Sequence, residues 1–132
     1  MEKNHLVGIW RLASWENRSK DGQVTYPFGQ DAVGYITYIE DGYMFVAIMT
    51  ANRPLFTSED ILGGSTEEKA AAAETYISYC GTYEIQGEKV IHHIEVSSFP
   101  NWVGSAQKRI FELKEDKLLL STLPLLLSGR QQ

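Results

Sequence analysis

A β-hairpin signal constrains the fold of this chain more than any other feature of its sequence. Residues 33–40 and 43–49 are two runs rich in aromatic and β-branched side chains, and only Asp41 and Gly42 separate them. An Asp-Gly pair readily adopts the positive φ angles of a two-residue reversal between antiparallel strands. The sequence therefore predicts a hairpin here, and an antiparallel sheet around it.

Short strand-like runs continue on both sides of this hairpin. A long first strand is expected at residues 6–18, with Trp10 and Leu12 on one face and Trp15 on the other, because side chains alternate along a strand. Pro27 restricts the next segment to an edge or a loop. Further strands are expected at residues 82–85, 89–97, 106–114 and 118–123. About seven short strands at close spacing favour one all-β domain over residues 1–132, an antiparallel up-and-down barrel, with a two-sheet sandwich as the alternative.

One helix is expected within this series of strands. Ser65 is followed three residues later by Glu68, which is the spacing of a capping box, and a run of alanines comes next. The pattern predicts a helix over residues 66–79, with a stripe formed by Ala73, Tyr76, Ile77 and Cys80. With the loop at residues 51–64, this helix is expected to lie over one mouth of the barrel, as a movable lid or as a static cap.

Composition excludes several classes of partner and cofactor. The net charge is −5, which disfavours binding to nucleic acid, and no basic cluster or long apolar run indicates a membrane role. No spacing typical of a metal, nucleotide or dinucleotide site occurs, so no cofactor is expected. Cys80 is the one cysteine and cannot form an internal disulfide. A reducing, cytoplasmic location is therefore expected.

An ordered set of short motifs resembles a known family. The set spans most of the chain and comprises Gly8-Ile9-Trp10, Tyr26-Pro27-Phe28-Gly29, Gly34-Tyr35, Asp41-Gly42-Tyr43-Met44, Arg53-Pro54, Tyr83-Glu84, His92-His93-x-Glu95 and Phe99-Pro100-Asn101-Trp102-Val103-Gly104. It is similar to the bacterial and fungal lipocalin-like domain family. The resemblance implies a small calycin-like barrel with an internal cavity, and it supports the fold more than the function.

The end of the sequence departs from the pattern of similar chains. Those chains run on into a closing strand with a late arginine, and here strand signal fades after Pro124. The expectation is either a truncated chain or a barrel left with a gap. An open edge invites pairing with another chain, so a homodimer that covers the gap is predicted.

The two adjacent histidines, His92 and His93, point to opposite faces of their strand and cannot share one metal ion. In one interpretation His93 and Glu95 lie in solvent, and the inward face consists of Val90, His92, Ile94 and Val96. In the other, His93 and Glu95 face the cavity as an acid/base pair. The sequence leaves both open, although each places one histidine inside.

Arg109 is the charged residue whose expected position most needs an explanation. It shares a strand face with Gln107, Phe111 and Leu113, while the opposite face carries Lys108, Glu112 and Lys114. Arg109 is therefore predicted to point inward, where an unpaired charge is costly. A buried ion pair with Glu95 or Glu16 is one explanation, and an anchor for an anionic ligand group is the other.

A second group of residues is predicted to line or close the cavity. Phe99, Asn101 and Trp102 stand around Pro100 in a loop that forms either a hydrophobic plug or a ligand entrance at one mouth. The candidate wall residues are Tyr38, Phe45, Met49, Tyr76 and Tyr83.

Three functions fit these features. The first is a barrel that binds a small, largely apolar or aromatic ligand. The second is a cofactor-independent isomerase, cyclase or dehydratase that uses an inward histidine with Glu95 and Arg109. The third is a filled barrel that acts as an interaction module. An interior cavity of about 300 Å³ or more separates the first two from the third.

Overall fold

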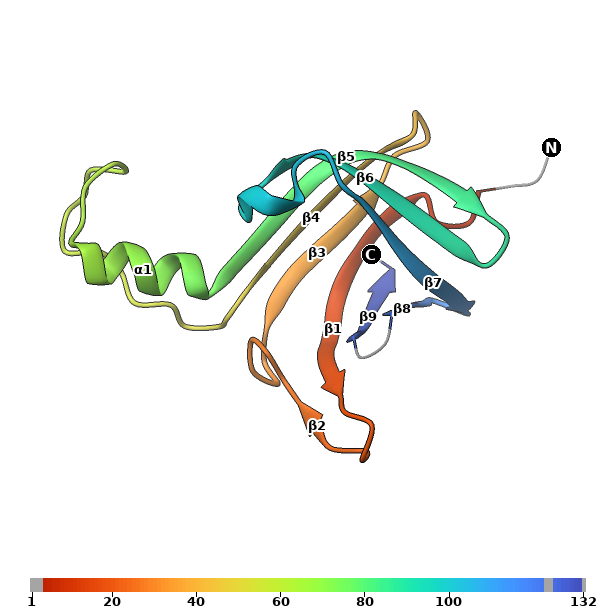
Figure 1. The fold of residues 1–132 in the computed structure, drawn as a ribbon, viewed down its shortest axis with the longest axis horizontal. Coiled ribbons are helices and arrows are strands. Elements are labelled where there is room, and N and C mark those ends of the chain that lie inside the picture. Colours follow the sequence, from red (N-terminus) through yellow and green to blue (C-terminus); the bar gives the residue numbers. More distant parts are fainter. Residues whose placement is uncertain (1–3, 123–124, 132) are drawn as a thin grey trace.

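The computed structural model describes residues 4–122 and 125–131 and forms an antiparallel barrel (Figure 1). Its elements, in chain order, are β1 (Gly8–Arg18), β2 (Val24–Thr25), β3 (Val33–Tyr38), β4 (Tyr43–Met49), α1 (Thr66–Glu74), β5 (Tyr76–Gln86), β6 (Lys89–Ser97), the 3-10 helix η1 (Pro100–Trp102), β7 (Ala106–Lys114), β8 (Lys117–Thr122) and β9 (Leu125–Gln131). Each ring strand pairs with the next one along the chain, and short β2 lies outside the ring. The predicted up-and-down barrel with one helix is confirmed.

The barrel is closed, because the closing strand that was expected to be absent is present. β9 pairs with β8 on one side and with β1 on the other, from Trp10 opposite Gln131 to Asn17 opposite Leu125. A close approach of the two backbones explains the glycine in this strand, because a Cβ atom at Gly129 would lie 2.9 Å from the carbonyl oxygen of Arg11. The prediction of a gap was wrong, and the open edge that motivated a homodimer does not exist.

The barrel interior is filled by apolar side chains that alternate along the strands. On β4, for example, Met44, Val46 and Ile48 are buried, whereas Phe45 between them is half-exposed. The largest side chains that are almost fully buried are Trp10, Tyr38, Leu6, Met44, Ile94, Leu118, His92 and Val90. Where this alternation is regular, as on β4, it identifies the interior face of the strand.

Two β-bulges overturn predictions based on strict alternation. The register of β1 against β9 shifts between Leu12 and Ser14, so Ala13 is an extra residue and Trp15 packs on the same core as Trp10. A second shift opposite Cys80 and Gly81 leaves Glu95 unpaired. Val96, which one of the two interpretations of this strand placed inside, is therefore 63% exposed.

The helix is shorter than predicted. Ser65 forms the expected capping box with Glu68, but α1 ends at Glu74, where the Thr75 hydroxyl donates to the carbonyl oxygen of Ala71. Tyr76 and the residues after it instead pair with β4 as part of β5. The proposed helical stripe is therefore wrong, because sheet pairing outweighs the weak helical periodicity of these residues.

α1 and the loop before it form an arm, defined here as residues 50–75, that projects away from the barrel wall (Figure 1). None of the residues of α1 is buried. Leu55, Ile61 and Leu62 are 92%, 94% and 82% exposed. The prediction of a lid over a mouth was wrong. Among the described residues, no helix is long and apolar enough to cross a membrane.

Candidate functional site

A buried histidine lies between two tyrosine hydroxyls inside the barrel. His92 on β6 is 1% exposed, and its Nε2 atom lies 2.7 Å from the hydroxyl oxygen of Tyr38 on β3. Its Nδ1 atom lies 2.8 Å from the hydroxyl oxygen of Tyr79 on β5. Both ring nitrogens therefore have a partner, so the ring is held in one orientation.

This environment keeps His92 neutral. Burial, and then the charge of Arg109, lower the pKa of His92 from 6.5 to about 3. Burial raises the pKa of Tyr79 to about 12 and that of Tyr38 well above its usual value of 10. A neutral imidazole has one N–H donor and one acceptor nitrogen. One tyrosine therefore donates to the ring, while the other accepts from it.

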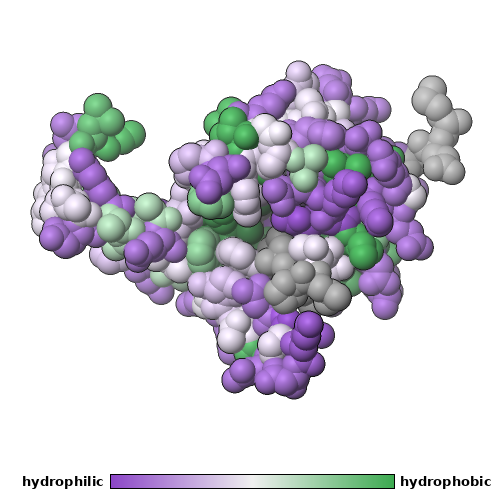
Figure 2. All heavy atoms as spheres, viewed as in Figure 1, coloured by the Kyte–Doolittle hydropathy of each residue, from purple (hydrophilic) through white to green (hydrophobic). Residues whose placement is uncertain are grey.

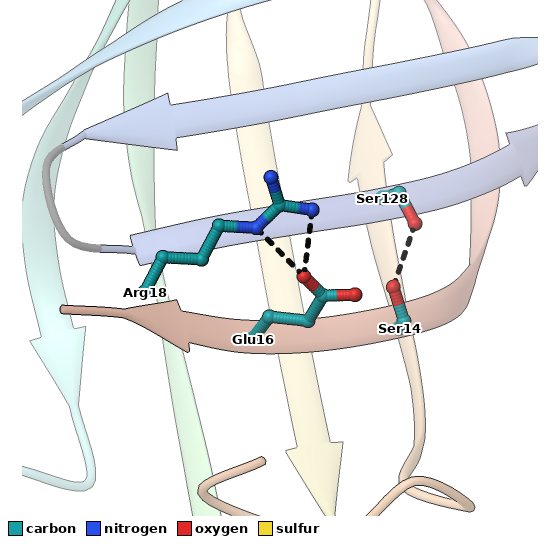
Figure 3. A network of polar contacts seen from close by, with 4 residues as sticks. All are labelled: Ser14, Glu16, Arg18 and Ser128. Atoms are coloured by element: carbon teal, nitrogen blue, oxygen red, sulfur yellow. Dashed lines mark hydrogen bonds and ion pairs between the residues drawn. The ribbon is translucent and has the colours of Figure 1, made fainter. Parts of the chain in front are cut away.

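Arg109 enters the same interior from β7, as predicted. It is 9% exposed, and its guanidinium donates to the backbone carbonyl oxygen of Lys108 at 3.0 Å. Within the described part of the chain, no carboxylate lies within 4.0 Å of its guanidinium nitrogens. The expected ion pairs are not formed, because Glu16 pairs with Arg18 at 3.1 Å (Figure 3) and Glu95 is exposed.

The second histidine faces outward. The ring of His93 lies 2.9 Å from a carboxylate oxygen of Glu84, and both side chains are nearly half-exposed. Since Glu95 is also exposed, the acid/base constellation of His93, Glu95 and Arg109 is not assembled. The interpretation that places His92 inside is the one the structure adopts. Within the described ranges, no three His, Cys, Asp or Glu residues gather closely enough to hold a metal ion.

The aromatic loop reaches this polar cluster through one ring contact. Trp102 at the end of η1 packs edge-on against Tyr79, with ring centroids 5.7 Å apart, and against Phe99 at 5.5 Å. Trp102 is half-buried, whereas Phe99 is 43% exposed and Asn101 is exposed. The loop therefore places one aromatic ring over the tyrosine that bonds to His92.

The enclosed space in the barrel is small. A hollow with a volume of about 330 Å³, open mouth included, has an enclosed part of about 30 Å³. Its walls are apolar, and they include Trp10, Leu12, Ile36, Val46, Ile48, Leu118 and Leu120. Figure 2 shows the surface hollowed between the segments that carry η1 and β2, with apolar side chains inside. The enclosed part has room for little more than one water molecule.

The other predicted wall residues divide between the two faces of the sheet. Tyr38 and Tyr83 point inward, and Tyr83 donates to the backbone carbonyl oxygen of Ile39 at 3.0 Å. Phe45, Met49 and Tyr76 lie on the outer face, so they do not line the interior. The reason is strand parity, which the sequence leaves ambiguous for continuous apolar runs.

Two residues of the site were missed. Tyr79 was assigned to the end of the helix, and Trp15 was assigned to the strand face opposite Trp10 and Leu12. The indole Nε1 of Trp15 is buried and has no hydrogen-bond partner among the described residues. The strand propensity of residues 76–80 is a signal that finds Tyr79. The bulge that turns Trp15 inward has no comparable mark in the sequence.

A closed up-and-down antiparallel barrel with a mainly apolar interior and a few buried polar side chains defines the lipocalin-like class. The family described as the lipocalin-like domain matches residues 7–132, and the chain belongs to that family. The resemblance seen in the sequence is therefore confirmed.

The chain is also similar to individual proteins. It is 36% identical over 98 residues to a 4'-hydroxy-3'-methoxypropiophenone carrier protein of Aspergillus oryzae, which covers 67% of this chain and 88% of that protein. A lipocalin-like protein of Bacteroides uniformis superposes with a TM-score of 0.59 at 12% identity, covering 98% of this chain and 100% of that one. A protein of Bacteroides eggerthii gives 0.55 at 14% identity, covering 96% and 99%. These two structures are similar in fold alone.

Proposed function

We propose that this barrel binds a small, largely apolar aromatic molecule in its interior. The observation that carries the proposal is Arg109, a charged side chain that faces inward without a carboxylate partner in the described part of the chain. The guanidinium nitrogens of Arg109 that make no hydrogen bond to described residues are not fully buried, so they still reach solvent, and a ligand that covers them must supply an acceptor oxygen. The carrier function named for the relative from Aspergillus oryzae supports the same class of ligand.

Binding requires the barrel to open further than it does here. Pockets for small molecules have volumes of about 300–1,000 Å³, and the enclosed interior is about 30 Å³. The aromatic loop is the segment best placed to move, because Trp102 contacts Tyr79 at the mouth and is only half-buried. In this proposal the loop is an entrance, and the barrel interior expands when a ligand enters.

Native mass spectrometry of freshly purified protein, together with a titration, tests this function. The titration uses 4'-hydroxy-3'-methoxypropiophenone as probe and follows tryptophan fluorescence. Saturable binding with one molecule per chain, or a retained small molecule of similar class, is expected. No binding of the probe and no retained molecule would overturn the proposal.

A filled barrel that acts as an interaction module is the second candidate. The small enclosed volume favours it, as do the exposed apolar side chains of the arm, Leu55, Ile61 and Leu62. Exposed apolar groups of this kind mark surfaces that bind other proteins. If aromatic probes leave the melting temperature unchanged at saturating concentrations, this second function replaces the first.

The homodimer and the cytoplasmic location stay predictions. The dimer no longer has an open barrel edge to support it, and its remaining support is the exposed apolar tip of the arm. The mass of the intact complex, measured over a range of protein concentrations, tests the dimer. Fractionation of source cells tests the location.

A further inference from the structure

Hydrogen-bond donors face the barrel interior from three strands. Successive ring strands run in opposite directions, so the end of β1 lies at the same end of the barrel as the start of β5 and the start of β7. Trp15 and Tyr79 stand near two of these strand ends and face inward, while Arg109 enters the interior from the middle of β7, opposite Val90 on β6. The charge of Arg109 acts on the pKa of both Tyr79 and His92, which places its guanidinium near these two side chains. The loop that carries η1 connects β6 to β7 at this same end (Figure 1).

The neutral His92 leaves one tyrosine proton without a partner. If Tyr38 donates to Nε2, then the Nδ1 proton is donated to Tyr79, and the hydroxyl proton of Tyr79 remains free. The opposite arrangement leaves the free proton on Tyr38, which is 1% exposed and packs against Tyr83. An unsatisfied donor costs more in the deeper position. The free proton therefore belongs to Tyr79, beside Trp102 and closer to the mouth.

Arg109 and Trp15 add donors of the same kind. The guanidinium has five N–H groups, and within the described residues its side chain makes one hydrogen bond, to the carbonyl oxygen of Lys108. The Trp15 indole N–H is buried and has no partner in that part of the chain. Neither group can accept a hydrogen bond. Arg109 and Trp15 thus present donors only, and the free hydroxyl proton of Tyr79 is a third donor.

We propose that the barrel interior selects aromatic ligands by an acceptor oxygen, a ketone carbonyl or a phenolate, that takes hydrogen bonds from Tyr79 and Arg109. The proposal rests on the proposed ligand-binding function and names the ligand group that this function would recognise. An apolar molecule of the same size leaves the donors unsatisfied, and buried unsatisfied donors are the basis of strong discrimination. His92 acts as a positioning residue, because it fixes which proton of the tyrosine pair is free.

Two probes that differ only in the acceptor test this selection. Propiophenone and n-propylbenzene have the same carbon skeleton, and only the ketone has a carbonyl oxygen. Their dissociation constants are measured with the whole chain by calorimetry or tryptophan fluorescence. Propiophenone is expected to bind about tenfold tighter or more, as for a hydrogen bond to a charged or buried donor. Without such donors the apolar probe would bind better, because a carbonyl loses water on burial.

Variants assign the preference to named side chains. Tyr79→Phe and Arg109→Gln are each expected to lower the affinity ratio of the two probes several-fold. Tyr43→Phe is the matched control, since Tyr43 is 48% exposed on the outer face, and its ratio is expected to equal that of the wild type. Thermal unfolding of each variant shows whether it is folded. If one of the two site variants fails to fold, the wild-type ratio and the other variant still decide.

The outcomes separate this inference from the function on which it rests. Equal binding of both probes, or tighter binding of n-propylbenzene, overturns the acceptor preference and leaves the ligand-binding function in place. A preference for propiophenone that survives in both Tyr79→Phe and Arg109→Gln also overturns the assignment. If neither probe binds and 4'-hydroxy-3'-methoxypropiophenone does not bind either, the proposed function fails, and this inference fails with it.

Discussion

The two ends of the barrel differ in whether their buried polar groups have hydrogen-bond partners. At the end that carries the N-terminus, the indole N–H of Trp10 donates to the carbonyl oxygen of Leu6 at 2.9 Å, and Asn4 donates to the Tyr83 hydroxyl at 2.8 Å. Towards the end that carries η1, the Trp15 N–H has no partner within the described residues, and Arg109, which enters the interior from the middle of β7, has no carboxylate partner there either. At the first end, these polar side chains are therefore hydrogen-bonded to other groups of the protein. The other end retains donors that the described protein groups leave unused.

The largest expected effect on stability comes from a substitution in the core at the end that carries the N-terminus. Leu6 is fully buried, so Leu6→Ala is expected to lower the free energy of unfolding by about 2–5 kcal/mol, through lost burial and the cavity left behind. Leu55→Ala in the arm is the matched control, since Leu55 is 92% exposed, and it is expected to change stability by less than about 0.5 kcal/mol. Urea unfolding measures both. Equal effects of the two substitutions would show that Leu6 is not a core residue.

Lowering the pH tests the interior between the two ends. The pKa of His92 is lowered to about 3 in the folded protein, so the unfolded chain binds a proton below pH 6.5 that the folded chain does not. Stability is therefore complete above pH 6.5 and is lost as the pH falls towards 3. A fall of about 2 kcal/mol is expected from pH 6.5 to 5. His92→Gln should flatten this part of the curve, and an unchanged slope would contradict the burial of a neutral His92.

Arg109→Met tests whether the protein itself satisfies the donors of Arg109. Without bound ligand, replacing this largely buried charge, which has no carboxylate partner among the described residues, is expected to raise the free energy of unfolding by about 1–2 kcal/mol. The variant should also lose the preference for propiophenone. Chemical denaturation of ligand-free protein measures the first effect. A loss of stability would mean that Arg109 is held by protein groups and has a structural role.

Tyr83→Phe is the smallest of these changes. It removes a hydroxyl that accepts from Asn4 and donates to the carbonyl oxygen of Ile39, and a cost of about 1 kcal/mol is expected. Binding of propiophenone should be unaffected, because this hydroxyl belongs to the closed end. A large loss of binding would place the ligand at the end that carries the N-terminus, and the two ends would then not differ in the way described.

Local chemistry predicted most of the fold. Asp41-Gly42 identifies a hairpin, and Ser65 with Glu68 identifies the start of a helix, because both signals act over a few residues. The alternation along β7 placed Arg109 inside correctly. The end of α1 was missed because residues 76–80 fit a helical pattern in isolation, and only their pairing with β4 makes them a strand.

The candidate site was harder to predict, because it depends on contacts between distant strands. His92 was expected inside as one of two alternatives, but its two tyrosine partners lie 54 and 13 residues away in the sequence. Phe45 and Met49 were placed inside because a continuous apolar run does not reveal its parity. The closing strand was missed because its run of leucines followed by Ser128 and Gly129 lacks alternation.

The bulge in β1 has a consequence for chain length. Ala13 is exposed and has no partner in the register of β1 with β9, so it is a spare residue in the barrel wall. Loss of its codon would restore regular pairing and leave Leu12 and Trp15 on the inner face. Loss of one codon in the middle of β3, whose register with β4 is unbroken, would turn every later side chain of that strand to the other face. A deletion of Ala13 should therefore leave the protein folded, whereas a deletion of one residue in the middle of β3 should prevent folding.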